Sequence, residues 1–154
     1  MCVDRLDLMI VSELQANARI STAELGRKIG LSTSATAERI TKLEKEGVIQ
    51  GYSAIVDGAR LGAGITAFIL VPVGNMTIDE MAELIISIPQ VQECHKVSGN
   101  ACFMVKVKAG SMDELEQTID RINQTAPNTY SYIVLSTVRE TAAIPINLKE
   151  EKDV

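Results

Sequence analysis

The sequence predicts an α+β protein with an N-terminal winged helix-turn-helix domain and a C-terminal ferredoxin-like βαββαβ domain. Helix caps followed by apolar residues at helical spacing fill residues 1–56, whereas β-branched runs alternate with two capped helices across residues 65–141. Between them, residues 57–64 hold three glycines in eight positions, which is typical of a linker. Residues 142–154 end in a charged stretch and are expected to form a frayed C-terminal tail.

The first helix is expected from Asp4 to about Ala16. Leu6, Ile10 and Leu14 recur at four-residue spacing and therefore share one face. An acidic side chain near the start suits the positive end of a helix. A short turn then leads to the next helix.

The second helix is expected to open at Ser21, with Glu24 three residues later. In this spacing each side chain can accept a hydrogen bond from the other residue's backbone N–H. Gly30 can adopt the left-handed conformation that ends a helix. Leu31 then fills the corner and Ser32 caps a third helix, so the two helices are joined by a tight turn.

The third helix has an inner face of Thr36, Ile40 and Leu43. Its outer face is small, polar or charged and consists of Thr33, Ser34, Ala37, Glu38, Thr41 and Lys42. The helix is expected to end near Gly47 and to pass into an extended run, as in winged variants of the motif. This pattern is typical of a DNA-binding helix-turn-helix. The alternative is an ordinary helical hairpin whose polar face meets water.

The second half of the sequence predicts strands and helices in the order β-α-β-β-α-β. The strands are expected at residues 65–73, 91–97, 102–107 and 130–138. The helices open at the capping pairs Thr77–Glu80 and Ser111–Glu114, with Met81, Leu84, Ile85 and Ile88 inward on the first and Met112, Leu115, Ile119 and Ile122 on the second. This order places both helices on one face of an antiparallel four-stranded sheet.

The other face of the predicted sheet has no helix to cover it. It can present Phe68, Val105 and Tyr132, or their neighbours in the strands. Such a face is an exposed apolar patch unless another subunit covers it. Self-association is therefore expected.

Composition narrows the class of protein. The net charge is −5, but residues 1–60 hold eight basic and eight acidic side chains, so the acidity lies in the second half. This N-terminal part, here called the head, has no net charge. That permits DNA binding without requiring it, because the local placement of cations decides whether phosphates are contacted. No apolar run approaches the ~20 residues of a membrane span, and the start does not resemble a signal peptide, which favours a cytoplasmic protein.

The reactive side chains indicate no catalytic or metal site. Cys2, Cys94 and Cys102 have neither CxxC spacing nor an even number, and there is a single histidine. We expect no enzyme activity, no cofactor and no bound metal. Cys94 and Cys102 are interpreted as small apolar residues. His95 is either a group that titrates near neutral pH or a structural hydrogen-bonding residue.

The chain resembles the Lrp/AsnC family of leucine-responsive, or feast/famine, transcriptional regulators from about Asp4 to Val138. Three stretches carry the resemblance: LDLMIVSELQANARIS at 6–21, ELGRKIGLSTSATAERITKLEKEGVIQGYSAIVD at 24–57 and ECHKVSGNACFMVKV at 93–107. It implies a dimeric regulator, often assembled into octamers, that binds double-stranded DNA and senses a small molecule, usually an amino acid. Thr36 departs from the aliphatic residue usual in the family, and its hydroxyl can bond to the helix backbone.

The resemblance places the DNA-reading helix on residues 32–46. The implied contacts to bases or phosphates are Thr33, Ser34, Ala37, Glu38, Arg39 and Lys42. Arg39 and Lys42 suit phosphates. Glu38 either accepts a hydrogen bond from a cytosine amino group or pairs with Lys42 one helical turn away, and the second interpretation is favoured.

The resemblance also places an effector site on the turn after the second strand of the C-terminal domain. The residues are Ser98, Gly99, Asn100, Ala101 and Cys102, where the family typically has the pattern G-x-(aromatic)-D. Here alanine replaces the aromatic residue and Cys102 replaces the acid, which would attract an α-ammonium group. The chain therefore either binds a different ligand, or binds an amino acid in a different pose, or regulates by assembly alone.

Three functions follow from these observations. The first is a sequence-specific, oligomeric DNA-binding regulator. The second is an effector-binding or interaction protein whose neutral head has weak or lost DNA affinity. The third is an enzyme on a ferredoxin-like scaffold, for which the sequence supplies no constellation of reactive groups. The first is favoured.

Overall fold

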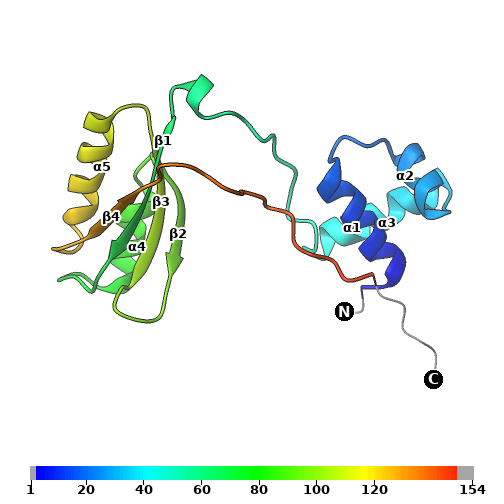
Figure 1. Ribbon diagram of the computed structural model, residues 1–154. Helices are drawn as coiled ribbons and strands as arrows, with labels where there is room; N and C mark the ends of the chain where they lie inside the picture. Colours follow the sequence, from blue (N-terminus) through cyan, green and yellow to red (C-terminus); the bar gives the residue numbers. More distant parts are fainter. Residues whose placement is uncertain (1–2, 149–154) are drawn as a thin grey trace. The chain divides into compact units, whose positions relative to one another are not determined.

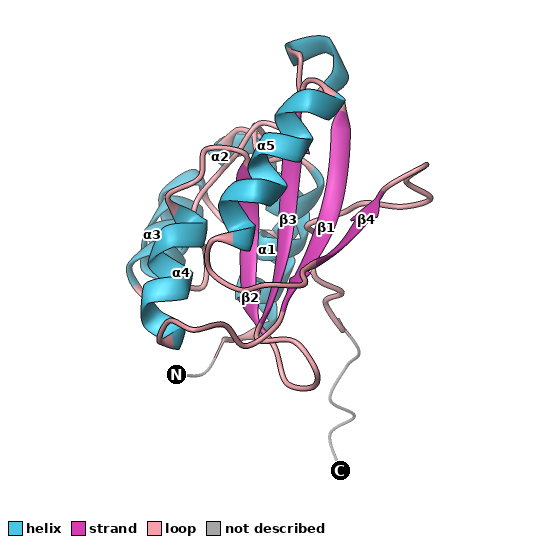
Figure 2. Ribbon diagram, turned by 90° about the vertical axis from the view of Figure 1, so that its left-hand side faces the viewer, coloured by secondary structure: helices cyan, strands magenta, loops and turns pink. Residues whose placement is uncertain are grey.

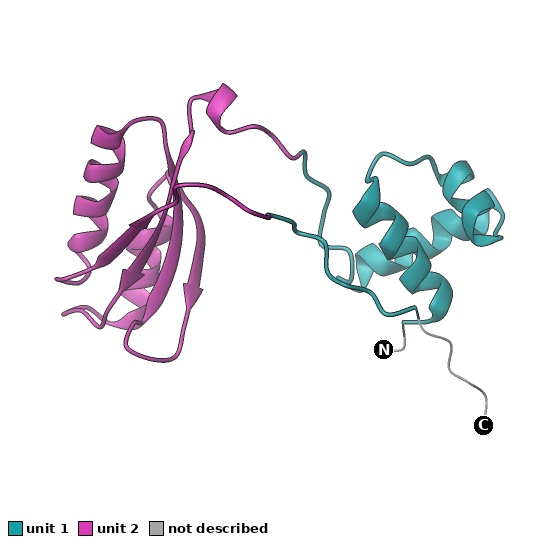
Figure 3. Cartoon of the chain, viewed as in Figure 1, with its two compact units in different colours: residues 1–54, 140–154 teal, residues 55–139 magenta. Residues whose placement is uncertain are grey.

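The computed structural model describes residues 3–148, and the chain divides into two compact units (Figure 3). The head unit comprises residues 1–54 together with residues 140–154. The sheet unit comprises residues 55–139. Cys2 and the end of the predicted tail, residues 149–154, lie outside the described part of the chain.

The head unit contains three helices: α1 (Arg5–Ala16), α2 (Thr22–Ile29) and α3 (Thr33–Lys45) (Figure 1). The side chains of Asp4, Ser21 and Ser32 cap them, each accepting a backbone N–H three residues later. The core is aliphatic and consists of Ile10, Leu25, Ile29 and Leu43, with Ile20, Leu31 and Ile40 packed against it. The three predicted helices are therefore confirmed.

The turn between α2 and α3 depends on a close approach at Gly26. This residue is buried, and a Cβ atom on it would lie 2.7 Å from the carbonyl oxygen of Leu31 and 2.9 Å from Oγ1 of Thr36. Thr36 is fully buried and donates its hydroxyl to the carbonyl of Ser32 at 2.8 Å, as its position in the helix predicted. Gly30 ends α2 at φ +77°, in the left-handed region expected for it.

One expectation for the head is wrong in detail. Ser21 accepts the backbone N–H of Glu24 at 3.2 Å, but the reciprocal bond from the Glu24 side chain is not formed in the described chain. The run expected after α3 carries no helix over residues 50–57 and joins no sheet there, and the 3₁₀ helix η1 (Ala59–Leu61) follows it.

Residues 140–148, here called the C-terminal strap, contact α1 rather than ending as a free tail. The side-chain amide of Gln15 donates to the carbonyl of Ile144 at 3.1 Å. It also accepts the backbone N–H of Ile144 at 2.6 Å. One amide group thus pairs with both backbone groups of one residue, as a neighbouring strand would.

The sheet unit contains the predicted order of elements: β1 (Ile65–Val71), α4 (Ile78–Ile86), β2 (Val91–Lys96), β3 (Phe103–Ala109), α5 (Met112–Asn123) and β4 (Tyr130–Ile133). The strands form one antiparallel sheet in the order β2-β3-β1-β4. Figure 2 shows both helices in front of the same face of this sheet. The ferredoxin-like βαββαβ arrangement is therefore confirmed.

The core lies between this face of the sheet and the two helices. Facing pairs such as Ile69 and Val105 on β1 and β3 are fully buried. From the helices, Met81 and Ile85 of α4 and Leu115 and Ile122 of α5 complete it, together with Ile88 beyond the end of α4.

Three expectations for the sheet unit are wrong. Val105 lies under the helices and not on the open face, because it is paired with the buried Ile69. Strand β4 ends at Ile133 instead of Val138: Val134 still donates to the carbonyl of Thr66, but β1 begins at Ile65 and leaves no further partner. Met112, expected inward on α5, is 53% exposed at the first position of that helix.

The open face of the sheet is apolar at its centre. Its side chains include Phe68, Leu70, Met104, Tyr130 and Tyr132, which pair across β1, β3 and β4. Tyr132 is 57% exposed, and both helices of the sheet unit lie over the other face of the sheet (Figure 2). The expectation of an exposed apolar patch is therefore confirmed for Phe68 and Tyr132.

We predict that Gly26→Ala destabilises the head unit by roughly 1–3 kcal/mol, because the added methyl group overpacks the contact between α2 and α3. Thermal unfolding followed by circular dichroism measures the change. Gly51→Ala is the matched control, since nothing lies within 4 Å of a Cβ atom there. Equal melting temperatures for the two variants would contradict the importance of this contact.

Candidate nucleic-acid interface

The outer face of α3 brings together the side chains that the sequence assigned to DNA. Thr33, Ser34, Ala37, Glu38 and Lys42 are all exposed. Residues 34, 38 and 42 recur every four positions, and 33 and 37 lie beside them, so the five side chains form one surface on a helix whose opposite side is buried. Arg39, the sixth predicted contact, is in a different environment.

The start of α3 is suited to an anion. Its first turn contains no acidic residue, so the positive end of the helix dipole is not offset there. The hydroxyls of Ser32 and Ser34 lie 3.2 Å apart at this end. Lys42 and Lys45 add cations in the last turn. Helix N-termini and hydroxyls of this kind commonly bind phosphate oxygens.

Glu38 and Lys42 do not pair with each other in the described chain, although pairing was the favoured interpretation of their spacing. Both side chains are exposed. An exposed pair on a helix surface is worth only about 0.3–0.5 kcal/mol, so its absence costs little stability. The carboxylate of Glu38 is left as a hydrogen-bond acceptor on the outer surface.

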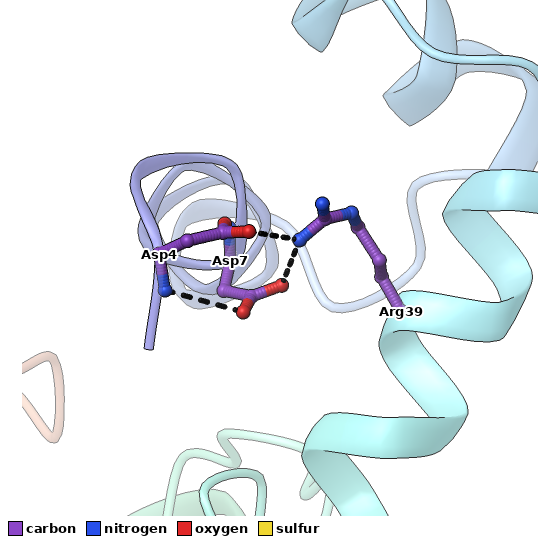
Figure 4. Close-up of polar contacts among 3 residues, drawn as sticks. All are labelled: Asp4, Asp7 and Arg39. Atoms are coloured by element: carbon purple, nitrogen blue, oxygen red, sulfur yellow. Dashed lines mark hydrogen bonds and ion pairs between the residues drawn. The ribbon is translucent and has the colours of Figure 1, made fainter. Parts of the chain in front are cut away.

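Arg39 is held by two carboxylates at the start of α1 (Figure 4). Its Nη1 lies 2.7 Å from Oδ2 of Asp4 and 2.7 Å from Oδ1 of Asp7. The side chain of Asp7 is 2% exposed, that of Arg39 29% and that of Asp4 49%. The guanidinium therefore links α3 to α1 instead of extending freely from the outer face.

The two acids also form the cap of α1. Asp4 accepts the backbone N–H of Asp7 at 2.8 Å, and Asp7 accepts that of Asp4 at 3.3 Å. The Asp7 backbone bond, and after it the Arg39 guanidinium, hold the pKa of Asp4 below its usual value. The hydrogen bonds that Arg39 donates to Asp4, and after it to Asp7, raise the pKa of Arg39.

Sequence reasoning missed Asp4, Asp7 and Gln15 as members of interacting groups. The spacing of Asp4 and Asp7 does signal a helix cap. Nothing local connects them with Arg39, which lies 32 positions beyond Asp7. Gln15 and Ile144 are 129 positions apart, and no pattern links them.

The predicted effector residues form the turn between β2 and β3. Ser98, Gly99 and Asn100 are exposed, whereas Ala101 and Cys102 are half-buried. Cys102 donates its N–H to the carbonyl of Val71 and accepts that of Val97, which fixes the base of the turn. Gly99 has φ +125°, a conformation that other residues rarely adopt.

The sulfur and imidazole groups near this turn have ordinary surroundings. Cys94 and Cys102 are free thiols packed against the core, and burial raises the pKa of Cys94. His95 is exposed, 3.3 Å from a carboxylate oxygen of Glu93, which also pairs with Lys106. This favours a surface hydrogen-bonding role for His95.

Within residues 3–148, no cluster of histidine, cysteine, aspartate or glutamate has the make-up of a metal site. None of the helices described there has the length and apolar content needed to cross a membrane.

Comparison with known proteins agrees with both units. Residues 3–50 match the winged helix-turn-helix DNA-binding family, and residues 66–144 match the Lrp/AsnC ligand binding domain. The chain is 34% identical over 140 residues to the HTH-type transcriptional regulator LrpC of Bacillus subtilis, covering 90% of this chain and 95% of that protein. It is 36% identical over 151 residues to the transcriptional regulator AzlB of the same organism, covering 94% and 96%.

A solved structure gives the same assignment. The feast or famine regulatory protein from M. tuberculosis, complexed with L-methionine, superposes with a TM-score of 0.87 at 32% identity, covering 95% of this chain and all of that one. Helix-turn-helix, sheet topology and sequence thus agree over nearly the whole length. The chain belongs to the Lrp/AsnC family of transcriptional regulators.

Proposed function

We propose that this protein is an oligomeric transcriptional regulator that binds specific double-stranded DNA sequences through α3. The observation that carries the proposal is the exposed outer face of α3. The first turn of this helix contains no acidic residue, and its last turn contains two lysines. A helix of this kind fits the major groove when its inner face is anchored on the other helices. The cytoplasm is the proposed location, because bacterial and archaeal DNA lies there.

Five of the six predicted contacts have a proposed role in contacting DNA. Thr33 and Ser34 donate hydrogen bonds to phosphate or base edges near the helix start. Ala37 permits close approach and can contact a thymine methyl group. Glu38, unpaired with Lys42, accepts from a cytosine amino group. Lys42 neutralises a phosphate.

The proposed assembly begins with a dimer and proceeds to an octamer. The open face of the sheet offers apolar side chains that a second copy can cover. The first residues of the sheet unit add exposed aliphatic side chains that a second copy can cover, such as Ile55 at 97% exposure. Paired heads would place two α3 helices about one DNA turn apart and favour imperfect palindromes.

The proposed effector site is the turn from Ser98 to Cys102. A relative of the same family has been solved with L-methionine, which makes an amino acid the first ligand to consider. Here the acid usual in the family is replaced by Cys102, which supplies no charge for an α-ammonium group. An amino acid would therefore bind weakly or in another pose, and would regulate by favouring one assembly state.

One observation favours the alternative, an effector-binding or interaction protein with weak or lost DNA affinity. Arg39 is paired with two carboxylates, so a cation assigned to phosphate contact is already compensated. Lys42, Lys45 and the helix N-terminus remain available on α3, and the proposal depends on them.

We expect the protein to retard DNA taken from upstream of its own gene, with an affinity that falls as salt rises. Lys42→Gln should weaken binding and reduce the slope of log K against log[salt] by about 0.9, the value for one lost phosphate contact. Lys96→Gln, the same charge change in the sheet unit, should leave both unchanged. Absence of any salt-dependent DNA binding by the native protein would favour the alternative.

We expect Tyr132→Glu to lower the sedimentation coefficient, because the buried charge would oppose association through the open face of the sheet. Gln117→Glu is the control, because it introduces the same residue at an exposed position on α5, the helix that covers the other face of the sheet. If both variants sediment like the native protein, the open face is not the assembly surface.

We expect Cys102→Asp to raise affinity for L-methionine by roughly tenfold or more, since a charge-assisted hydrogen bond contributes about 1.5–3 kcal/mol. Titration calorimetry, repeated with the other amino acids, measures the change. Cys102→Ser preserves size without adding charge and should bind as the native protein does. Equal affinity in all three proteins would show that position 102 does not contact the α-ammonium group of the ligand.

A further inference from the structure

The cluster of Asp4, Asp7 and Arg39 connects the first turn of α1 with the middle of α3 through a closed set of contacts. In each acid, one carboxylate oxygen accepts a backbone N–H of the cap and the other accepts from Arg39. The cap fixes the two carboxylates, and the carboxylates fix the guanidinium. Two acids surround one cation, so the cluster as a whole carries negative charge.

This charge balance is unfavourable for phosphate contact by Arg39. A cation attracts phosphate in proportion to its uncompensated charge, and here both short contacts of Nη1 are already made to carboxylates. Transfer of Arg39 to DNA would leave Asp7, which is 2% exposed, buried without a counter-charge. Loss of one partner from a buried pair is strongly unfavourable.

The cluster also determines how α3 is oriented. Near its start, α3 is positioned by the close approach of Thr36 to Gly26 on α2. Three residues later, Arg39 attaches it to α1. Two contacts on different helices restrict rotation of α3 about its own axis, and such a rotation would turn Ser34, Glu38 and Lys42 away from the groove.

We propose that Arg39 is a positioning residue that acts through Asp7 and Asp4 to orient the DNA-reading helix, and not a phosphate contact. This inference rests on the proposed DNA-binding function and revises one of its assigned residues. It makes the first turn of α1 part of the DNA-binding apparatus, although this turn itself need not touch DNA.

The test is a double-mutant cycle of Asp7→Asn and Arg39→Gln in the full chain, read out by both DNA affinity and its salt dependence. The probe is the DNA upstream of the protein's own gene. A positioning role predicts that each single variant weakens binding by roughly tenfold, with the slope of log K against log[salt] unchanged. The double variant should bind no worse than the weaker single variant, because the two substitutions remove the same pair.

The opposite set of results would overturn the proposal. If Arg39 contacts phosphate, Arg39→Gln should reduce the salt slope by about 0.9, as Lys42→Gln does. Asp7→Asn should then strengthen binding, because it releases the guanidinium. Native protein without salt-dependent DNA binding would refute the proposed function and this inference together, whereas a changed slope in Arg39→Gln alone refutes only the inference.

Asp4→Asn is the alternative test variant if Asp7→Asn and Arg39→Gln do not fold. Asparagine is as good a helix cap as aspartate, so α1 should be retained, while one charge beside Arg39 is lost. A positioning role predicts an unchanged salt slope and affinity equal to or below that of the native protein. Tighter binding with a steeper slope would show that DNA and the acids compete for Arg39.

Discussion

The contact between α2 and α3 at Gly26 and Thr36 determines which side of α3 faces outward. Because Gly26 has no side chain, the carbonyl of Leu31 and the hydroxyl of Thr36 can lie where a Cβ atom would be. This buries the face that includes Leu43 and leaves Ser34 and Lys42 exposed. The proposed DNA surface is therefore a consequence of how closely two helices can pack.

The sheet unit follows a similar logic on a larger scale. Both of its helices lie over one face, so the aliphatic core is complete on that side and absent on the other (Figure 2). The face that remains has aromatic side chains and a charged group around Glu93. In the proposed function, one face serves the stability of the unit and the other serves association, and the proposed effector turn lies at the end of the β2–β3 hairpin.

Local chemistry made most of the fold predictable. Ser21, Gly30 and Ser32 set the limits of the helix-turn-helix by bonds to residues only a few positions away. Features that depend on pairing between residues far apart in the sequence were not predictable in the same way. The face of Val105 is set by its register with Ile69, and the length of β4 by where β1 begins.

The candidate site shows the same limit. Exposure of the outer face of α3 follows from helical periodicity, so Thr33, Ser34 and Lys42 could be placed from sequence. The environment of Arg39 could not, because its partners are on another helix and a lone sequence gives no indication of the pairing. Likewise, Glu38 and Lys42 have the spacing of an ion pair, but exposed side chains in water gain too little from pairing for spacing to decide it.

The contact between Gln15 and the C-terminal strap changes how the domains are connected. Both ends of the described chain belong to the head unit, so the sheet unit is in effect an insertion between α3 and the strap. Two polypeptide crossings, not one, join the units and close a ring through the amide of Gln15. A segment that follows the sheet unit in the sequence thus completes the head unit that precedes it.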